Sequence, residues 1–189
     1  MPKQSFEDFY NKAKTINFVQ YKTYYQGLQY EKLYNKLTEI RNNLGSNISA
    51  LDWGGGQGHC SLLLSYLKFK TTLFSIVKYE KPWELLSRKG VEIAFQPKSI
   101  KNLNFKDKSF NISVSCGVLE HVRETGGDEI ESLKELSRVT KDFIVIYHLP
   151  NKYSWIEWFT RSFRSGVYSH PYRYTNSEIN NMVKQIKDF

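Results

Sequence analysis

The chain is poor in cysteine and has no long apolar run. Its 189 residues include two cysteines, Cys60 and Cys116, which are far apart and form no CxxC pair. This spacing argues against a disulfide framework or a zinc site, so we expect two buried free thiols. No apolar run approaches the roughly 18 residues that a membrane span needs, and the first residues lack the apolar core of a signal peptide. The sequence therefore predicts a cytoplasmic protein without a membrane span or a metal site.

The chain also lacks repeats, low-complexity segments and any dense block of lysines. Its formal net charge is nevertheless +8, from 27 Lys and Arg against 19 Asp and Glu. Such a charge favours contact with phosphates or anionic surfaces. Because the basic residues are spread along the chain, a solvated basic surface is the simpler interpretation, and binding of nucleic acid remains an alternative that no motif supports.

Short apolar segments alternate with segments of helical periodicity. The expected strands are residues 48–53, 71–77, 91–95, 110–116 and 143–147. The expected helices are residues 28–44 with a stop at Gly45, then 60–67, 83–89, 130–139 and 179–186, the last opened by a capping box from Thr175 to Glu178. This alternation predicts an α/β fold with a mostly parallel sheet of about five strands. Ligands of such sheets bind beyond the carboxyl ends of the strands.

A glycine-rich segment follows the first expected strand. Residues 52–58 read Asp-Trp-Gly-Gly-Gly-Gln-Gly, so that Gly54, Gly56 and Gly58 follow Asp52 in the pattern D-x-G-x-G-x-G. A glycine turn between a strand and a helix lets the backbone pass close to a ligand. The dinucleotide pattern G-x-G-x-x-G would need its third glycine at position 59, which is His59. The spacing therefore disfavours an NAD site.

The glycine loop resembles motif I of the class I S-adenosylmethionine-dependent methyltransferases. Two further segments resemble the same family: residues 105–122, which contain the block Leu-Glu-His-Val, and residues 133–139, which match the helix before the fifth strand. The three segments cover about residues 45–150 and are similar to the ubiquinone-type, or type 11, branch. The resemblance implies an S-adenosylmethionine-dependent methyltransferase with a Rossmann-like, doubly wound sheet. The C-terminal β-hairpin of the full family fold is missing from this sequence, which suggests a truncated chain or a sheet edge covered by a partner or a dimer.

The resemblance also implies which residues bind the cofactor. The set comprises the loop and four positions outside it: Asp52, Gly54, Gly56, Gln57, Gly58, Glu80, Ser99, Ile100 and Cys116. In the family, an acid at the end of the second strand binds both ribose hydroxyls. No acid lies at the usual spacing near Ser75; Glu80 is the nearest candidate, with an exposed glutamate at a helix start as the alternative. Ser99 stands where the family carries an Asp near the adenine, and Asn111 replaces another usual Asp.

The methyl acceptor is expected to bind where the family varies. His148 follows the fifth strand and is the favoured proton acceptor; the alternatives are His121, His170 and Glu120, and each could instead be structural. Aromatic residues between 153 and 174 are expected to cover the acceptor pocket, with Tyr21, Tyr24 and Tyr25 as a lid. We divide this single methyltransferase domain, residues 1–189, into an N-terminal helical lid (1–45), a cofactor-binding core (46–150) and an aromatic substrate segment with a final helix (151–189).

The favoured function is methylation of a small molecule, a lipid or a sugar intermediate. The alternatives are an RNA or protein methyltransferase, which only the net charge supports, and a truncated, non-catalytic relative, which the weakened ribose and adenine positions suggest.

Overall fold

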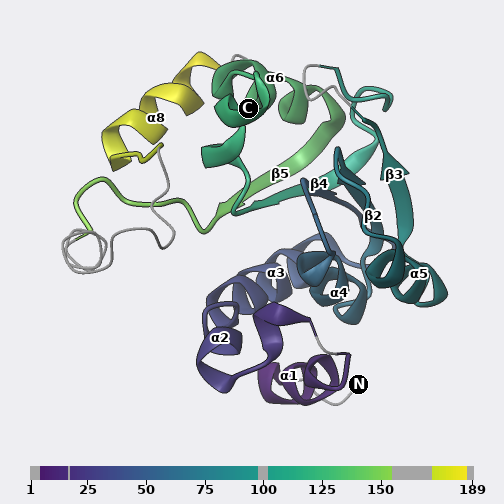
Figure 1. The fold of residues 1–189 in the computed structure, drawn as a ribbon. Helices are drawn as coiled ribbons and strands as arrows, with labels where there is room; N and C mark the ends of the chain where they lie inside the picture. The colour runs from purple at the N-terminus through teal and green to yellow at the C-terminus, as the bar shows by residue number, and fades with distance from the viewer. Residues whose placement is uncertain (1–4, 17, 98–101, 155–171, 187–189) are drawn as a thin grey trace.

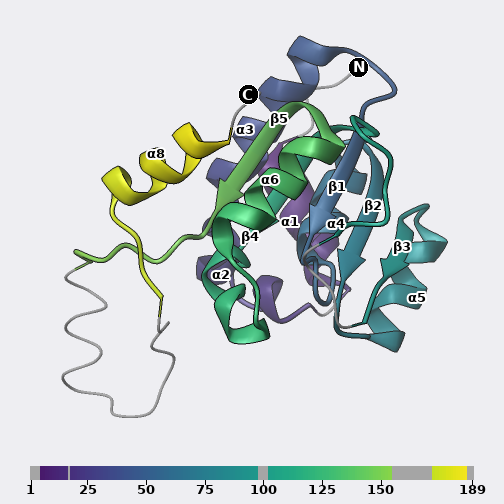
Figure 2. The ribbon, with the colours of Figure 1, turned by 90° about the horizontal axis from the view of Figure 1, so that it is seen from above.

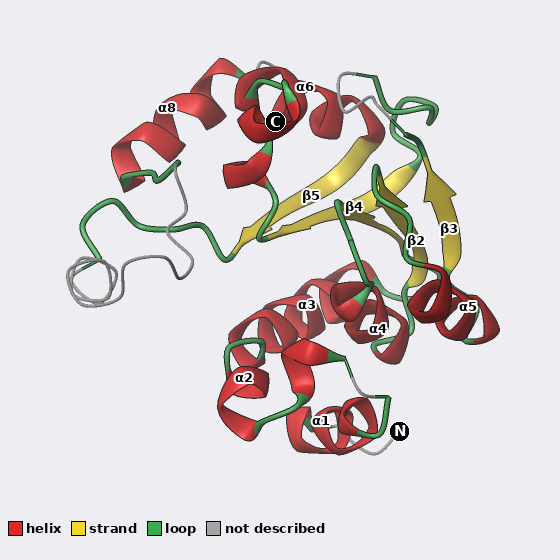
Figure 3. Ribbon diagram, in the orientation of Figure 1, coloured by secondary structure: helices red, strands yellow, loops and turns green. Residues whose placement is uncertain are grey.

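A five-stranded parallel sheet forms the centre of the molecule. The computed structural model describes residues 5–16, 18–97, 102–154 and 172–186 (Figure 1). The strands, drawn in yellow in Figure 3, lie in the order β3-β2-β1-β4-β5, and every neighbouring pair is parallel. Their bounds are β1 Ser49–Trp53, β2 Lys70–Ser75, β3 Glu92–Phe95, β4 Phe110–Cys116 and β5 Thr140–Tyr147. This confirms the predicted Rossmann-like architecture. In the described part of the chain β5 is an edge strand, so the sheet is not closed.

Helices cover both faces of the sheet (Figures 1 and 2). One face carries α1 (Phe6–Lys14), α2 (Tyr24–Leu28), α3 (Glu31–Leu44), α4 (His59–Tyr66) and α5 (Glu80–Arg88). The other carries α6 (Glu129–Val139) and α8 (Asn176–Gln185). Successive residues of β1 serve the two cores in turn, because side chains alternate along a strand: Ala50 packs with the first group of helices and Leu51 with the second. The order of strands reverses at β1, between β2 and β4, which is where such sheets bind ligands.

The N-terminal region contains more helix than the sequence pattern indicates. The expected helix over residues 28–44 corresponds to α3, which begins at Glu31, whereas Leu28 is the last residue of the separate short helix α2. Thr23 fixes the start of α2, since its side chain accepts a hydrogen bond from the Gln26 backbone N–H. Gly27 lets α2 approach α1 closely: a Cβ at this position would lie 2.5 Å from a ring carbon of Tyr10. Tertiary packing therefore places this short helix, which has no period of its own.

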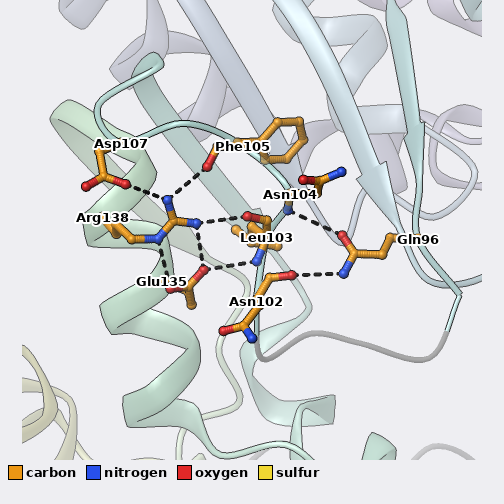
Figure 4. A network of polar contacts seen from close by, with 8 residues as sticks. All are labelled: Gln96, Asn102, Leu103, Asn104, Phe105, Asp107, Glu135 and Arg138. Carbon is orange, nitrogen blue, oxygen red and sulfur yellow. Dashed lines mark hydrogen bonds and ion pairs between the residues drawn. The ribbon is translucent and has the colours of Figure 1, made fainter.

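Arg138 joins two of the three sequence segments that carry the family resemblance (Figure 4). Its guanidinium donates to the backbone carbonyls of Leu103 and Phe105, each at 2.8 Å. It also forms ion pairs with Asp107 at 2.7 Å and Glu135 at 2.9 Å. The planar guanidinium can bind all four groups at once. Arg138 therefore fixes the segment that leads into β4 against α6.

Two smaller predictions are confirmed. The capping box at the start of α8 is present, with Glu178 N–H donating to Thr175 Oγ1 and Thr175 N–H donating to the Glu178 carboxylate. Cys60 and Cys116 are buried free thiols. Among the residues described, no helix is long and apolar enough to cross a membrane, and no cluster of three metal-ligating side chains occurs.

Candidate functional site

The glycine loop is held in a conformation that side chains disfavour. Gly54, Gly56 and Gly58 have φ angles of 73°, 54° and 95°, in the region that only glycine enters readily. Gly58 is also the N-terminal cap of α4, so the free backbone N–H groups of that helix lie beside the loop. The pattern D-x-G-x-G-x-G has glycine at these three positions, and the positive φ angles of the backbone explain why glycine is needed at each.

The loop is also packed too tightly for side chains. A Cβ at Gly54 would lie 2.4 Å from a methyl of Val118, and one at Gly58 would lie 2.1 Å from Leu86 Cδ1. The Gly55 N–H donates to the Phe74 carbonyl at 3.0 Å, and Trp83 Nε1 donates to the Gly56 carbonyl at 2.7 Å. β2, α5 and the loop after β4 therefore all contact this turn and hold it in place.

Asp52 lies behind the glycine loop. Its side chain is 1% exposed and accepts a hydrogen bond of 2.5 Å from Ser61 Oγ. Burial raises the pKa of Asp52 to about 6, although hydrogen bonds from Ser61 and Cys60 oppose the shift. A Cβ at Gly55 would lie 2.6 Å from the Asp52 carboxylate. Asp52 thus packs against the buried side of the loop at Gly55 and does not line the neighbouring cavity.

A cavity of about 190 Å³ opens at the carboxyl ends of β1, β2 and β4. The ends of these strands and the loops after them line it, and among the described residues no lysine or arginine contributes to the lining. They are Trp53, Gly54 and Gly56 at and after the end of β1; Phe74, Ser75, Ile76, Val77 and Tyr79 at and after the end of β2; and Gly117, Val118, His121, Val122 and Thr125 after β4. The position agrees with the expectation from strand order. The sequence segment Leu-Glu-His-Val, residues 119–122, thus contributes His121 and Val122 to this cavity, and Val118 directly before it also lines the cavity.

On the β2 side of the cavity, none of the lining residues that the structure describes carries a carboxylate. The Ser75 hydroxyl donates to the Val77 carbonyl at 2.8 Å and accepts from the Val77 N–H at 3.2 Å, so its own turn satisfies it. Glu80 is the first residue of α5 and forms an ion pair with Lys78 at 2.8 Å, with its side chain 77% exposed. Lys78 lowers the pKa of Glu80. The assignment of Glu80 to the ribose remains a prediction, and the exposed position of Glu80 outside the lining of the cavity argues against it.

The other predicted cofactor residues fall into three groups. Cys116 ends β4 and lies against Cys60, whose pKa is raised, chiefly by a hydrogen bond between the two thiols and then by burial. Gln57 lies in the glycine loop but does not line the cavity. Ser99 and Ile100 lie outside the described residues, and their assignment to the adenine remains a prediction.

His148 lies directly after β5 and packs in an aromatic environment. Its ring stacks on Tyr147 at 4.8 Å and lies 5.1 Å from the ring of Tyr30. Its φ is 61°, which is unusual for a residue with a side chain. Burial lowers the pKa of His148, although a hydrogen bond from its ring to the Gln29 carbonyl opposes the shift. His148 is therefore mostly neutral near pH 7 and can accept a proton.

The alternative proton acceptors are placed differently. His121 lines the cavity and lies 3.0 Å from the Glu124 carboxylate. Glu120 is 2% exposed, and its Oε2 has no hydrogen-bond partner among the described residues; burial raises its pKa. His170 lies outside the described residues.

Most of the aromatic segment that is expected to cover the acceptor pocket, residues 155–171, also lies outside the described residues. Tyr153 is 81% exposed, whereas Tyr174 is buried and its hydroxyl donates to Glu129 at 2.7 Å. In the expected lid, Tyr24 and Tyr25 are exposed, but Tyr21 is fully buried and donates to the His59 carbonyl at 2.9 Å.

Sequence reasoning did not single out His59, Tyr30 or Trp83. His59 follows the last loop glycine, and its ring lies 5.2 Å from that of Tyr30. Its position next to the loop was the one signal that the sequence offered. The neighbours of Tyr30 and Trp83 depend on contacts with residues far away in the chain.

The shape of the loop and the residues that line the cavity decide whether S-adenosylmethionine fits this site. The backbone at Gly54 and Gly56 lines the cavity directly, so the loop offers the side-chain-free wall that the methionine part of the cofactor needs. The residues at this end therefore fit the cofactor. At the β2 end, the described lining residues do not include the carboxylate that holds the ribose in the family. A parallel sheet in this order with this loop defines the class of Rossmann-like methyltransferases.

Residues 51–143 match the family model described as a methyltransferase domain. This segment is a class I S-adenosylmethionine-dependent methyltransferase domain of the type 11 branch, and the chain is accordingly a methyltransferase whose cofactor is S-adenosylmethionine. A search of curated protein sequences gives no significant match.

Solved structures share the fold at low sequence identity. A magnesium protoporphyrin IX methyltransferase from Synechocystis, solved with bound S-adenosylhomocysteine, is 13% identical with a TM-score of 0.63; the alignment covers 95% of this chain and 83% of that one. The YcgJ protein of Bacillus subtilis is 23% identical with a TM-score of 0.61, covering 82% and 67%. A methyltransferase from Aquifex aeolicus is 15% identical with a TM-score of 0.55, covering 94% and 87%.

Proposed function

We propose that this enzyme transfers the methyl group of S-adenosylmethionine to a small-molecule acceptor, a class in which we include lipid and sugar intermediates. The observation that carries the proposal is the glycine loop, whose backbone at Gly54 and Gly56 forms one wall of the cavity at the switch point of the sheet. The cofactor supplies an activated methyl group on a positively charged sulfur. The protein therefore has mainly to align donor and acceptor and to exclude water.

Individual residues support this function in different ways. Asp52 and Trp83 hold the loop from opposite sides, the first from behind Gly55 and the second through the Gly56 carbonyl. His148 is our candidate proton acceptor, because it is neutral near pH 7 and lies against Gly117 at the edge of the cavity. We further propose that α1 to α3 and the segment after β5 enclose the acceptor.

The surroundings of the cavity favour a small acceptor over a nucleic acid. Within the part of the chain that the structure describes, no lysine or arginine lines it, although the chain carries a net charge of +8. Binding of a phosphate backbone depends on basic side chains near the reacting group. The positive charge of the chain is therefore better explained by its solvated surface.

Calorimetry with S-adenosylmethionine tests the proposal directly. We expect the natural protein to bind and Gly58→Ala to lose about tenfold or more in affinity, because its Cβ would collide with Leu86. Gly90→Ala is a matched control: Gly90 also has a positive φ, 82°, but nothing lies within 4 Å of its Cβ position. Circular dichroism of both variants shows whether the fold is kept. Absence of binding by the natural protein at millimolar cofactor would refute the proposal.

A further inference from the structure

A second cavity, which we call the basic cleft, is lined by positively charged side chains. Its volume is about 560 Å³. Among the described residues, three cations line it, Arg123, Lys152 and Arg173, against the single carboxylate of Glu178. The cavity at the glycine loop differs, because no described lysine or arginine lines it. An excess of positive charge in a cleft favours an anionic ligand.

One short turn of helix forms a wall between the basic cleft and the cavity at the glycine loop. This turn is the 3-10 helix Arg123–Thr125, which directly follows Val122. Val122 and Thr125 line the cavity at the glycine loop, whereas Arg123 lines the basic cleft. A molecule that reaches around this turn therefore contacts both cavities.

Arg123 is held in place by a buried carboxylate. Glu129, the first residue of α6, is 1% exposed and accepts hydrogen bonds from Arg123 Nε and from the Tyr174 hydroxyl, each at 2.7 Å. The guanidinium of Arg123 also lies over the ring of Tyr172, 5.3 Å from its centre. These two contacts fix the plane of the guanidinium. Within the described residues only Nε of Arg123 forms a hydrogen bond, so both terminal nitrogens can bind a ligand.

The other two cations come from segments on either side of residues 155–171. The Lys152 N–H donates to the Tyr174 carbonyl at 3.1 Å, which joins the chain after β5 to the chain before α8. This pairing brings Lys152 and Arg173 to the same cleft. Lys152 forms an ion pair with Glu178 at 3.4 Å. Even when the buried Glu129 is counted with Glu178, the cations outnumber the carboxylates.

We propose that the basic cleft binds the phosphate monoester group of the methyl acceptor, with Arg123 as the residue that recognises the phosphate oxygens and with Lys152 and Arg173 as supporting cations. This inference rests on the proposed methyltransferase function and names the chemistry of its acceptor. The acceptor is a small phosphorylated molecule, either a sugar phosphate or a lipid phosphate.

The geometry of the cations favours a phosphate over a carboxylate. An arginine that is fixed at Nε presents its two terminal nitrogens as a fork, which matches two oxygens of one phosphate. A phosphate monoester carries a charge of about −1.5 to −2 near pH 7 and has three acceptor oxygens, so it can bind several cations at once. A carboxylate has a single charge and two oxygens, and it would leave part of the positive charge unpaired.

Calorimetry with simple phosphates, in the absence of cofactor, tests the basic cleft. The full chain is titrated with glucose 6-phosphate and with dihexanoyl phosphatidic acid, which represent the two sources of phosphate. Glucose, dihexanoylglycerol and glucuronate are the controls. We expect one of the phosphates to bind at least about tenfold more tightly than its uncharged counterpart and than glucuronate, and the tighter of the two identifies the source. Phosphates that bind no better than the controls would overturn the inference.

Variants locate the bound phosphate. Arg123→Lys keeps a charge beside Glu129 but lacks the planar fork, so the affinity for the phosphate should fall about tenfold. Lys152→Met removes an exposed cation without leaving a buried carboxylate unpaired, and it should lower the affinity about threefold. Arg88→Met is the control, because Arg88 pairs with Glu84 on the surface of α5 and should leave binding unchanged. Natural affinity in both cleft variants would contradict the assignment.

Methyl transfer tests whether the phosphate belongs to the acceptor. A small-molecule extract of the cells that produce this protein is treated with active or inactivated phosphatase, and the chain is then added with S-adenosylmethionine that carries a radiolabelled methyl group. We expect active phosphatase to lower the labelled product at least about tenfold. Unchanged labelling would overturn the inference and leave the proposed function intact. No labelled product from either extract would count against the proposed function, and the calorimetric titrations would still decide the phosphate site.

Discussion

Two acidic residues near the glycine loop, Asp52 and Glu80, differ in role because one is buried and the other is exposed to solvent. Asp52 is buried and supports the loop, whereas Glu80 is exposed and pairs with Lys78. Both are acids that a sequence comparison assigns to the cofactor. Only Asp52 lies against the glycine loop, so only its change of charge should alter the stability of the loop.

Replacing Asp52 by asparagine should change how stability depends on pH. Burial raises the pKa of Asp52 from 3.8 to about 6, so the folded state favours the protonated carboxyl. This contribution is fully present below about pH 4 and is lost as the pH rises through 6. From pH 4 to pH 7, the natural protein should therefore lose about 2 kcal/mol in free energy of unfolding relative to Asp52→Asn. Urea denaturation of both proteins across this range measures the difference; two parallel curves would contradict the assignment.

Introducing a carboxylate at Val77 should strengthen cofactor binding. Val77 lines the β2 end of the cavity and is 52% exposed, so Val77→Asp should fold normally. A carboxylate there can accept from both ribose hydroxyls, a gain of about tenfold in affinity for a charged hydrogen bond. Calorimetry with S-adenosylhomocysteine and with its 2′,3′-dideoxy analogue measures the effect, with Val77→Asn as the uncharged control. An equal gain for both ligands would show that the ribose is not involved.

At the level of helices and strands, the motifs of the sequence divide into those that form the cavity and those that hold the elements together. The segment after β4 supplies cavity residues, but Asp107, Glu135 and Arg138 lie in a polar network away from it (Figure 4). Asn111, which replaces an aspartate of the family, accepts from the Ser49 N–H at 3.0 Å and donates to Asp142 at 2.8 Å. It therefore links β1, β4 and β5 near their starts.

Removing the guanidinium of Arg138 should loosen the junction of α6 with the segment before β4. We expect Arg138→Met to lower the free energy of unfolding by about 2 kcal/mol, since two carbonyls and two carboxylates lose their partner. Arg88→Met is the control, because Arg88 pairs with Glu84 on the surface and both side chains are mostly exposed; its effect should be below about 0.5 kcal/mol. Urea denaturation measures the free energy of unfolding of both variants. Equal losses of free energy would show that the Arg138 network stabilises the fold no more than a surface ion pair does.

At the scale of the whole molecule, the loop is the point where separate parts of the chain converge. β2 and α5 contact it on one side, and the loop after β4 contacts it on the other. A ligand at the loop therefore binds the assembled fold and not a local segment. Its binding should stabilise the whole protein.

Thermal unfolding should report this coupling. S-adenosylhomocysteine at about one hundred times its dissociation constant stabilises the folded state by about 2.7 kcal/mol. For a chain of 189 residues this corresponds to a rise in melting temperature of about 5–10 °C. Differential scanning calorimetry measures the rise, which a tenfold loss of affinity in Gly58→Ala should reduce to about half at the same ligand concentration. An unchanged melting temperature at saturating ligand would contradict the proposed site.

The sequence by itself determined the order of the elements, the glycine loop and the family. Strands and helices follow from apolar periodicity, which is a local property, and the φ angles of the loop glycines follow from residue type. The tertiary structure alone decided that His59, Tyr30 and His148 meet, that Asp52 lies behind the loop, and that no described carboxylate lines the cavity beside β2. The physical reason is that these features depend on packing between residues tens of positions apart, and side-chain spacing along one chain carries no record of such contacts.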